Sequence, residues 1–126
     1  MRRAPATAPK RQSPGRGIQV IDLSRVRRRL NKLNQEIRYA DCFAGAQFTA
    51  GLIAFRSSRK ANAKQIRHAD KDVLCLVIEG SGRLRIGRKR IALRPGTVCH
   101  VRKGTPHDFT SGGPGELVLF YSLIKS

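Results

Sequence analysis

The stretch that decides the fold is "LRPGTVCHVRKGTPHDF", residues 93–109, in which a short β-prone segment lies between two turns. Pro95 fixes φ for a bend, and Gly96 and Gly104 can adopt the positive φ values that other residues avoid. The central run "TVCHV" fits a pleated, half-buried surface. His107 therefore comes just after a strand, on a turn of the kind that carries functional groups in β proteins.

Short β segments separated by turns continue on both sides of this stretch. In "GRLRIGRKRIAL" (82–93) apolar and basic residues alternate, which assigns one face of each strand to a core and the other to solvent. Many short strands without the spacing of β-α-β units predict an antiparallel sandwich or barrel. The predicted strands cover residues 47–55, 73–79, 82–87, 90–93, 97–101 and 116–124.

The N-terminal third is strongly basic. Residues 1–40 contain nine arginines and two lysines against Asp22 and Glu36, and so carry half of the net charge of +18. The first seventeen residues offer almost nothing that a core could bury. We therefore predict a disordered basic arm over residues 1–20, whose charge calls for an anionic partner or serves solubility.

An amphipathic helix is predicted over residues 21–40. Asp22 or Ser24 can cap it, and five aliphatic residues then recur at steps of three and four, as one helix face requires. These residues are Leu23, Val26, Leu30, Leu33 and Ile37. The stripe is expected to pack on the body of the protein or on a second subunit; a membrane surface and nucleic acid are the alternatives.

Composition limits the remaining possibilities. A chain of 126 residues forms one domain, and with no Trp and 6% aromatic residues its core must be mostly aliphatic. Neither a membrane-spanning run nor a secretory signal is present, although an Arg-rich, acid-poor arm leaves organelle targeting open. Cys42, Cys75 and Cys99 lie in apolar contexts without paired spacing, which predicts buried free thiols in a cytoplasmic protein.

The order of glycines, proline and histidine resembles the cupin superfamily, small double-sheet barrels of the jelly-roll kind. The second motif of that family runs Gly, five residues, Pro, one residue, Gly, two residues, His, three residues, Asn. Here Gly96, Arg102, Gly104, His107 and Ser111 occupy those places. Both glycines and the histidine match, while the proline and the asparagine are replaced.

The first cupin motif is degenerate in this chain. It runs Gly, five residues, His-x-His, three or four residues, Glu, six residues, Gly. Anchored on Gly80, it places Val73 at the glutamate, His68 at the second histidine, Ile66 at the first and Lys60 at the opening glycine. The resemblance is therefore more specific for the fold than for the chemistry.

The resemblance spans about residues 47–124 and implies a small single-domain, RmlC-like protein. The implied fold is mainly β, an antiparallel double-stranded β-helix or jelly-roll barrel with a basic N-terminal arm and one amphipathic helix. The chain would divide into the arm at 1–20, the helix at 21–40 and a cupin-like β-barrel domain at 41–126. Because small cupins commonly pair through their sheets, the resemblance also implies a homodimer.

For the site, the resemblance implies a pocket around His68 and His107. Cupin metal centres hold iron, manganese, nickel, zinc or copper with imidazoles and one carboxylate. Val73 cannot bind a metal, so the ligand set would be reduced. If the loop slips by a residue or two, Asp70 completes a set of two histidines and one carboxylate; alternatively, His100 joins the two histidines. Fe, Mn, Ni or Zn would then be the cofactor.

Some of these residues also have ordinary structural roles open to them. His68 and Asp70 lie in a charged loop, and His100 points away from the pocket if Cys99 faces the core. Cys75 lies two residues after Val73, which occupies the glutamate position, so both side chains point to the same side of the strand.

Cys75 and Val73 are accordingly predicted to line the ligand pocket, unless Cys75 only packs as a small apolar side chain.

Three functions remain open at this point. The first is a module whose pocket around His68 and His107 binds a metal ion or a small ligand, anionic if arginines take part. The second is a metal-dependent enzyme of the dioxygenase or isomerase type. The third is association with nucleic acid or another anionic surface through the basic arm. Val73 counts against the enzyme, and the lack of aromatic residues among the cations counts against the third function.

Overall fold

The computed structural model describes residues 17–57 and 68–126, and within them the chain forms one short helix and nine strands. They are α1 (Leu23–Arg27), β1 (Asn31–Lys32), β2 (Ile37–Ala44), β3 (Phe48–Phe55), β4 (Lys71–Glu79), β5 (Gly82–Ile86), β6 (Lys89–Leu93), β7 (Val98–Val101), β8 (Asp108–Ser111) and β9 (Leu117–Lys125). The basic arm predicted over residues 1–20 lies outside the described residues as far as residue 16.

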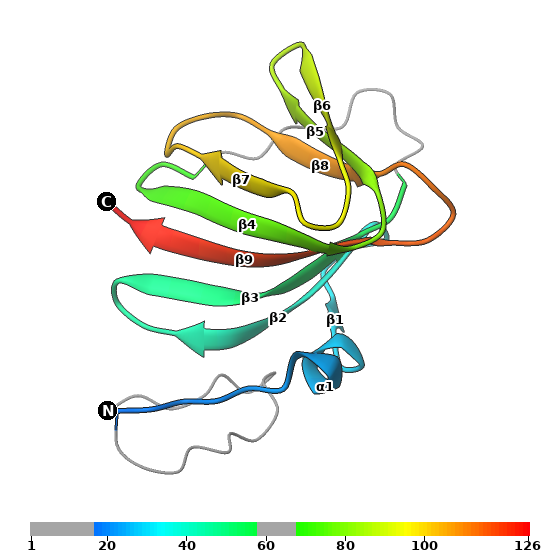
Figure 1. The fold of residues 1–126 in the computed structure, drawn as a ribbon. Helices are drawn as coiled ribbons and strands as arrows, with labels where there is room; N and C mark the ends of the chain where they lie inside the picture. Colours follow the sequence, from blue (N-terminus) through cyan, green and yellow to red (C-terminus); the bar gives the residue numbers. More distant parts are fainter. Residues whose placement is uncertain (1–16, 58–67) are drawn as a thin grey trace.

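The strands form two antiparallel sheets (Figure 1). The larger sheet has the order β1-β2-β3-β9-β4-β7, and the smaller one has the order β6-β5-β8. The C-terminal strand β9 lies between β3 and β4, strands from opposite halves of the barrel. The antiparallel β-barrel predicted from the sequence is therefore confirmed, and β3, β4, β5, β6, β7 and β9 lie within two residues of their predicted bounds.

The amphipathic helix predicted over residues 21–40 is wrong over most of its length, because α1 ends at Arg27 and Ile37 begins β2. The side chain of Asn34 turns the chain instead. Its Oδ1 accepts hydrogen bonds from the backbone N–H groups of Glu36 and Ile37 at 2.8 and 2.9 Å. Such local side-chain bonds compete with helix formation, and the residues that follow pair with β3 along its whole length.

The core between the two sheets is built from the inward-facing residues of both. Alternation along each strand directs every second side chain to this interior. The buried members are Phe55, Val73, Cys75, Val77, Leu84, Leu93, Cys99, Val101, Leu117 and Leu119.

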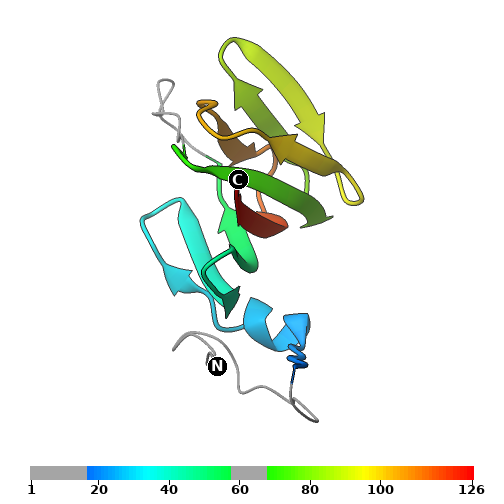
Figure 2. The ribbon, with the colours of Figure 1, turned by 90° about the vertical axis from the view of Figure 1, so that its left-hand side faces the viewer.

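A second apolar cluster lies on the opposite face of the larger sheet, beneath α1. Val26 is fully buried there against residues of β2, β3 and β9. Figure 2 shows α1 beside the β2 and β3 strands and away from the smaller sheet. The expectation that the N-terminal stripe packs on the body of the protein thus holds for Val26, Leu23 and Leu30, whereas Leu33 is exposed.

Glu116, just before β9, binds arginines of two other elements through its carboxylate. Arg38 of β2 donates two hydrogen bonds to it, at 2.6 and 3.0 Å, and Arg27 of α1 donates one at 3.1 Å. The Glu116 side chain is only 13% exposed. The hydrogen bond from Arg38, and then that from Arg27, hold the pKa of this carboxyl below its usual value against the opposing effect of burial.

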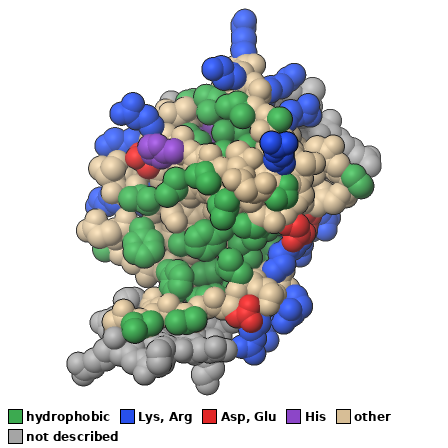
Figure 3. Space-filling view, in the orientation of Figure 1, with side chains coloured by type: hydrophobic (Ala, Val, Ile, Leu, Met, Phe, Trp, Pro, Cys, Tyr) green, Lys and Arg blue, Asp and Glu red, His purple; other side chains and the backbone are tan. Residues whose placement is uncertain are grey.

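Large apolar side chains are exposed on the outer face of the larger sheet, away from α1. They gather as the green area over the middle of the molecule in Figure 3. They are Phe48, Leu74, Leu76, Ile78, Val98 and Ile124. Exposed apolar groups that lie together, unlike scattered ones, often mark a contact surface. No helix in the described part of the chain is long and apolar enough to cross a membrane.

The ion pairs of Glu116 predict how a substitution at this position changes the free energy of unfolding. Replacing Glu116 by Gln leaves the partly buried guanidinium group of Arg38 without a carboxylate and removes one of the two carboxylates that bind Arg27, so we expect a loss of about 1–3 kcal/mol in the free energy of unfolding at pH 7. The matched control is Glu79→Gln, whose carboxylate also binds Arg27 but is 52% exposed; it should lose less than about 1 kcal/mol. Urea unfolding of both variants measures the difference.

The same cluster gives the pH dependence of that loss. Because the pKa of Glu116 is lowered from 4.5 in the folded chain, its contribution is present above that pH and disappears as the pH falls through the folded value. The two variants should therefore differ at pH 7 and converge in acid. Equal losses for both variants at pH 7 would contradict the assignment of Glu116 as the organising carboxylate.

Candidate functional site

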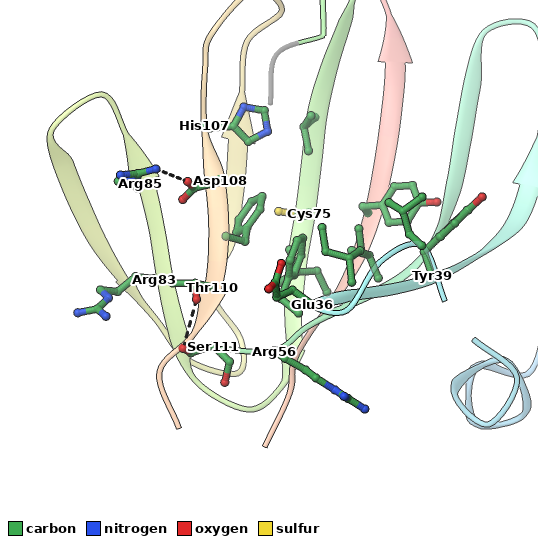
Figure 4. A pocket seen from close by; sticks show the side chains of 18 of the residues that line it. Glu36, Tyr39, Arg56, Cys75, Arg83, Arg85, His107, Asp108, Thr110 and Ser111 are labelled. Atoms are coloured by element: carbon green, nitrogen blue, oxygen red, sulfur yellow. Dashed lines mark hydrogen bonds and ion pairs between the residues drawn. The ribbon is translucent and has the colours of Figure 1, made fainter. Parts of the chain in front are cut away.

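The two sheets leave an open hollow of about 1160 Å³ between them (Figure 4). Its interior wall is mostly apolar and aromatic, and comes from the inner face of the larger sheet and from β8. The wall includes Ile37, Ile53, Phe55, Val73, Cys75, Phe109, Leu119, Tyr121 and Leu123. The hollow also extends past the edge strand β8 to the outer face of the smaller sheet, where arginines line it.

His107 is placed on this wall by the turn between β7 and β8. Gly104 has φ of +79°, which lets the chain reverse there. The His107 ring is 5% exposed, and its Nδ1 lies 2.8 Å from the carbonyl oxygen of Thr105. A carbonyl can only accept, so Nδ1 carries the hydrogen of this bond, and in the neutral ring Nε2 keeps its lone pair.

His68 lies beside His107, with ring centroids 6.1 Å apart and planes inclined at 42°. The backbone holds the two segments together, because the N–H of Gly104 donates to the carbonyl of His68 at 2.7 Å. Burial lowers the pKa of His68, and His107 and Lys71 lower it further. Both histidines line the hollow.

The structure separates the other predicted site residues into two groups. Val73 and Cys75 line the hollow from β4. His100 lies on the opposite face of β7, 54% exposed, with Nε2 at 3.2 Å from Asp72. Asp70 is exposed and lies 3.9 Å from the ammonium group of Lys71. Neither Asp70 nor His100 therefore joins His68 and His107 to complete the ligand set.

The residues present do not fit a cupin metal centre. Among residues 17–57 and 68–126, no three His, Cys, Asp or Glu side chains come together in a way that could hold a metal ion. The segments 1–16 and 58–67 contain none of these four residue types in their sequence. Catalytic sites of this kind use three protein ligands or more. His68 and His107 are two, and Val73 occupies the place of the carboxylate.

A tyrosine and an aspartate on the floor of the hollow were missed by the sequence analysis. Tyr121 of β9 donates its hydroxyl to Asp41 of β2 at 2.6 Å, and the two are directly in register across Gly51 of β3. A Cβ at Gly51 would overlap the carbonyl oxygen of Ala40 and touch the Tyr121 hydroxyl. Burial, followed by this hydrogen bond, raises the pKa of Tyr121 well above its usual value.

A signal for this pair does exist in the sequence. Gly51 interrupts a run of strand-forming residues, and a glycine inside a strand often marks a close approach of another group. The pair was missed because the helix predicted over 21–40 includes the first residues of β2, the strand that carries Asp41.

Arginines border the hollow on the side of the smaller sheet. Arg83 and Arg85 alternate with the buried Leu84 of β5, so they lie on the face turned away from the core (Figure 4). Arg85 forms an ion pair with Asp108 at 2.6 Å. With Arg90 and Arg56, four arginines line the hollow against the three carboxylates of Glu36, Asp41 and Asp108, which leaves an excess of one positive charge.

Comparisons with known proteins agree with this architecture. The family model of the AraC-like ligand binding domain matches residues 56–125. Among solved structures, the chain resembles a putative ethanolamine utilization protein Q from Salmonella typhimurium with a TM-score of 0.73 at 20% identity, covering 92% of this chain and 93% of that one. No curated protein sequence matches the chain.

Two further structures have lower scores. An RmlC-like cupin from Shewanella frigidimarina gives a TM-score of 0.62 at 15% identity, over 77% of this chain and 83% of that one. A predicted oxalate decarboxylase from Thermotoga maritima gives 0.63 at 14% identity, over 98% and 97%. Such identities establish the fold and nothing about the reaction. With more than half of its length matched by the family model, the chain belongs to the AraC-like ligand binding domain family, within the cupin superfamily.

Proposed function

We propose that this protein is a non-catalytic binding or sensor module that holds a small organic ligand in the hollow. The observation that supports this proposal is the pair His68 and His107, two imidazoles side by side in a wall that is otherwise mostly apolar and aromatic. Binding pockets commonly combine an apolar wall with a few placed polar groups. The family to which the chain belongs is a ligand-binding one.

The ligand best suited to these groups is a small hydroxy acid. Phe55, Phe109 and Leu119 accommodate an apolar body. With Nδ1 engaged by Thr105, Nε2 of His107 accepts a hydrogen bond from a hydroxyl group. The small excess of positive charge around the hollow favours a carboxylate at its mouth.

The metal-dependent enzyme is the alternative, and it would need a ligand from outside the protein to complete the coordination sphere. Two imidazoles without a carboxylate retain some affinity for zinc or nickel. The experiment described next distinguishes the two functions, because binding of a metal and binding of a hydroxy acid are tested separately for dependence on His107.

The test compares His107→Asn with His100→Asn. Asparagine keeps a donor for the carbonyl of Thr105 and lacks the second ring nitrogen, while His100 lies outside the hollow. Lactate, malate, tartrate and gluconate are added separately, with succinate as the acid without a hydroxyl, and melting temperatures are recorded. We expect at least one hydroxy acid to stabilise the wild type and His100→Asn, and to bind His107→Asn about tenfold more weakly, as loss of one hydrogen bond implies.

Equal stabilisation of all three proteins, or of none, would contradict the proposal. Zinc, nickel, manganese and ferrous iron form the second arm of the same experiment. Near-stoichiometric metal in freshly purified wild type that is lost in His107→Asn would favour the enzyme instead.

The pKa of His68 predicts how stability depends on pH. Because this pKa is lowered from 6.5 in the folded chain, the unfolded chain takes up the proton first as the pH falls. The free energy of unfolding should therefore decrease below about pH 6.5, and level off once the folded His68 is also protonated. Urea unfolding at a series of pH values measures this slope. His68→Gln should reduce this slope and His100→Gln should not; an unchanged slope in His68→Gln would be inconsistent with a partly buried ring whose pKa is lowered.

We also propose that two copies pair through the exposed apolar face of β4 and β7. Leu74, Leu76 and Val98 are large, exposed and uncharged there, in a chain whose net charge of +18 disfavours association elsewhere. Sedimentation of the wild type should show a dimer, Val98→Lys should be monomeric, and Leu33→Lys, at an exposed position outside this face, should remain dimeric. A wild-type monomer at micromolar concentration would rule out the pairing.

A further inference from the structure

We propose that Cys75 and Cys99 form a redox-active dithiol in the wall of the barrel, a modification site at which a hydroperoxide closes a disulfide between β4 and β7. The proposal does not depend on which ligand the hollow binds. It is based on the register of the two strands, on the side of the sheet that the two thiols share, and on the access that the hollow provides.

The two cysteines are directly opposite each other. In the antiparallel pairing of β4 with β7, Cys75 is the register partner of Cys99, next to the pair Val73 and Val101. Directly opposed residues of antiparallel strands have Cα atoms about 4.5–5.5 Å apart, which is within the range of about 4.4–6.8 Å that disulfides span. Both side chains belong to the inner core, so they point to the same side of the sheet.

The two thiols affect each other's ionisation. The neighbouring Cys75 side chain lowers the pKa of Cys99, and the Cys99 side chain raises that of Cys75. The ionised thiol of the pair is the reactive form, because a thiolate attacks an oxidant.

The hollow gives a small reagent access to this pair. Cys75 is only 2% exposed and Cys99 9%, yet Cys75 is part of the wall that lines the hollow. A hydroperoxide can reach Cys75 by that path.

The third cysteine, Cys42, provides the natural comparison. It is buried in the other cluster, beneath α1 on the opposite face of the sheet, with no cysteine beside it in that cluster. Burial raises its pKa to about 11.

The oxidation takes place in two balanced steps. One thiolate of the pair attacks one oxygen of hydrogen peroxide; an S–O bond forms, the O–O bond breaks, and the hydroxide that leaves takes a proton from solvent to become water. The other thiol then attacks the sulfur of this sulfenic acid; the S–S bond forms, the S–O bond breaks, and the leaving hydroxide takes the proton of the attacking thiol to become a second water. The two sulfurs lose two electrons and the peroxide gains them. A dithiol reductant reverses the change.

The disulfide would alter both the hollow and the edge of the sheet. It removes the Cys75 thiol from the wall and links β7, the edge strand of the larger sheet, covalently to β4. Oxidation would therefore change the hollow on the wall that faces Phe109 and His107 without cutting or extending the chain.

The test is oxidation of the folded, reduced protein with hydrogen peroxide at neutral pH, followed by unfolding, alkylation of the remaining thiols and mass spectrometry of the intact chain and its peptides. We expect the wild type to become lighter by two hydrogen atoms before alkylation and to react at one cysteine in place of three. A cross-linked peptide should contain Cys75 and Cys99, and dithiothreitol should restore all three thiols. After the same peroxide treatment, the Cys42→Ser variant should also become lighter by two hydrogen atoms.

Variants of the pair should behave differently. Cys75→Ser and Cys99→Ser should show no such mass loss and should instead gain oxygen at the remaining thiol. The proposal would be overturned if the wild type gained oxygen on separate cysteines, if Cys42 entered the disulfide, if the cross-link joined two chains, or if all three thiols survived a peroxide concentration that oxidises free dithiothreitol. The main result is measured on the wild type, so the test remains decisive even if a variant fails to fold.

Discussion

The pairing of β9 with both β3 and β4 is the constraint on which the rest of the structure depends. The strand is held on both sides along nearly its whole length, and both of its faces are buried over its first three residues. Leu117 and Leu119 enter the core between the sheets, while Val118 enters the cluster beneath α1. One strand therefore joins the β2–β3 half of the barrel to the β4–β7 half, and places Glu116 where it can bind arginines of two other elements.

The same pairing explains why the hollow has two chemically different ends. Tyr121 reaches Asp41 across β3, which makes a hydrogen-bonded floor at the β2 side. His68 and His107 meet at the β4 and β8 side, held by a backbone hydrogen bond between their loops. Neither end brings together three side chains that could hold a metal ion, among residues 17–57 and 68–126.

Some of this protein follows from its sequence alone, because the information is local. Alternation of apolar and polar residues predicts the strands and shows which of their side chains face inward, as for Val73 and Cys75. The spacing of Gly96, Gly104 and His107 indicates the turn that carries the second histidine, and the resemblance to cupins adds that His68 lies beside it. These features depend on neighbours in the chain, so tertiary contacts change them little.

Only the tertiary structure decided which distant residues meet. The stripe from Leu23 to Ile37 fits a helix by its period, but pairing with β3 buries more of the chain, and the stripe is divided between a short helix and a strand. The exposure of His100, the bond between Tyr121 and Asp41, and the pairing of Cys75 with Cys99 all depend on strand register. Register is set by the burial of whole sheets, and no short stretch of sequence records it.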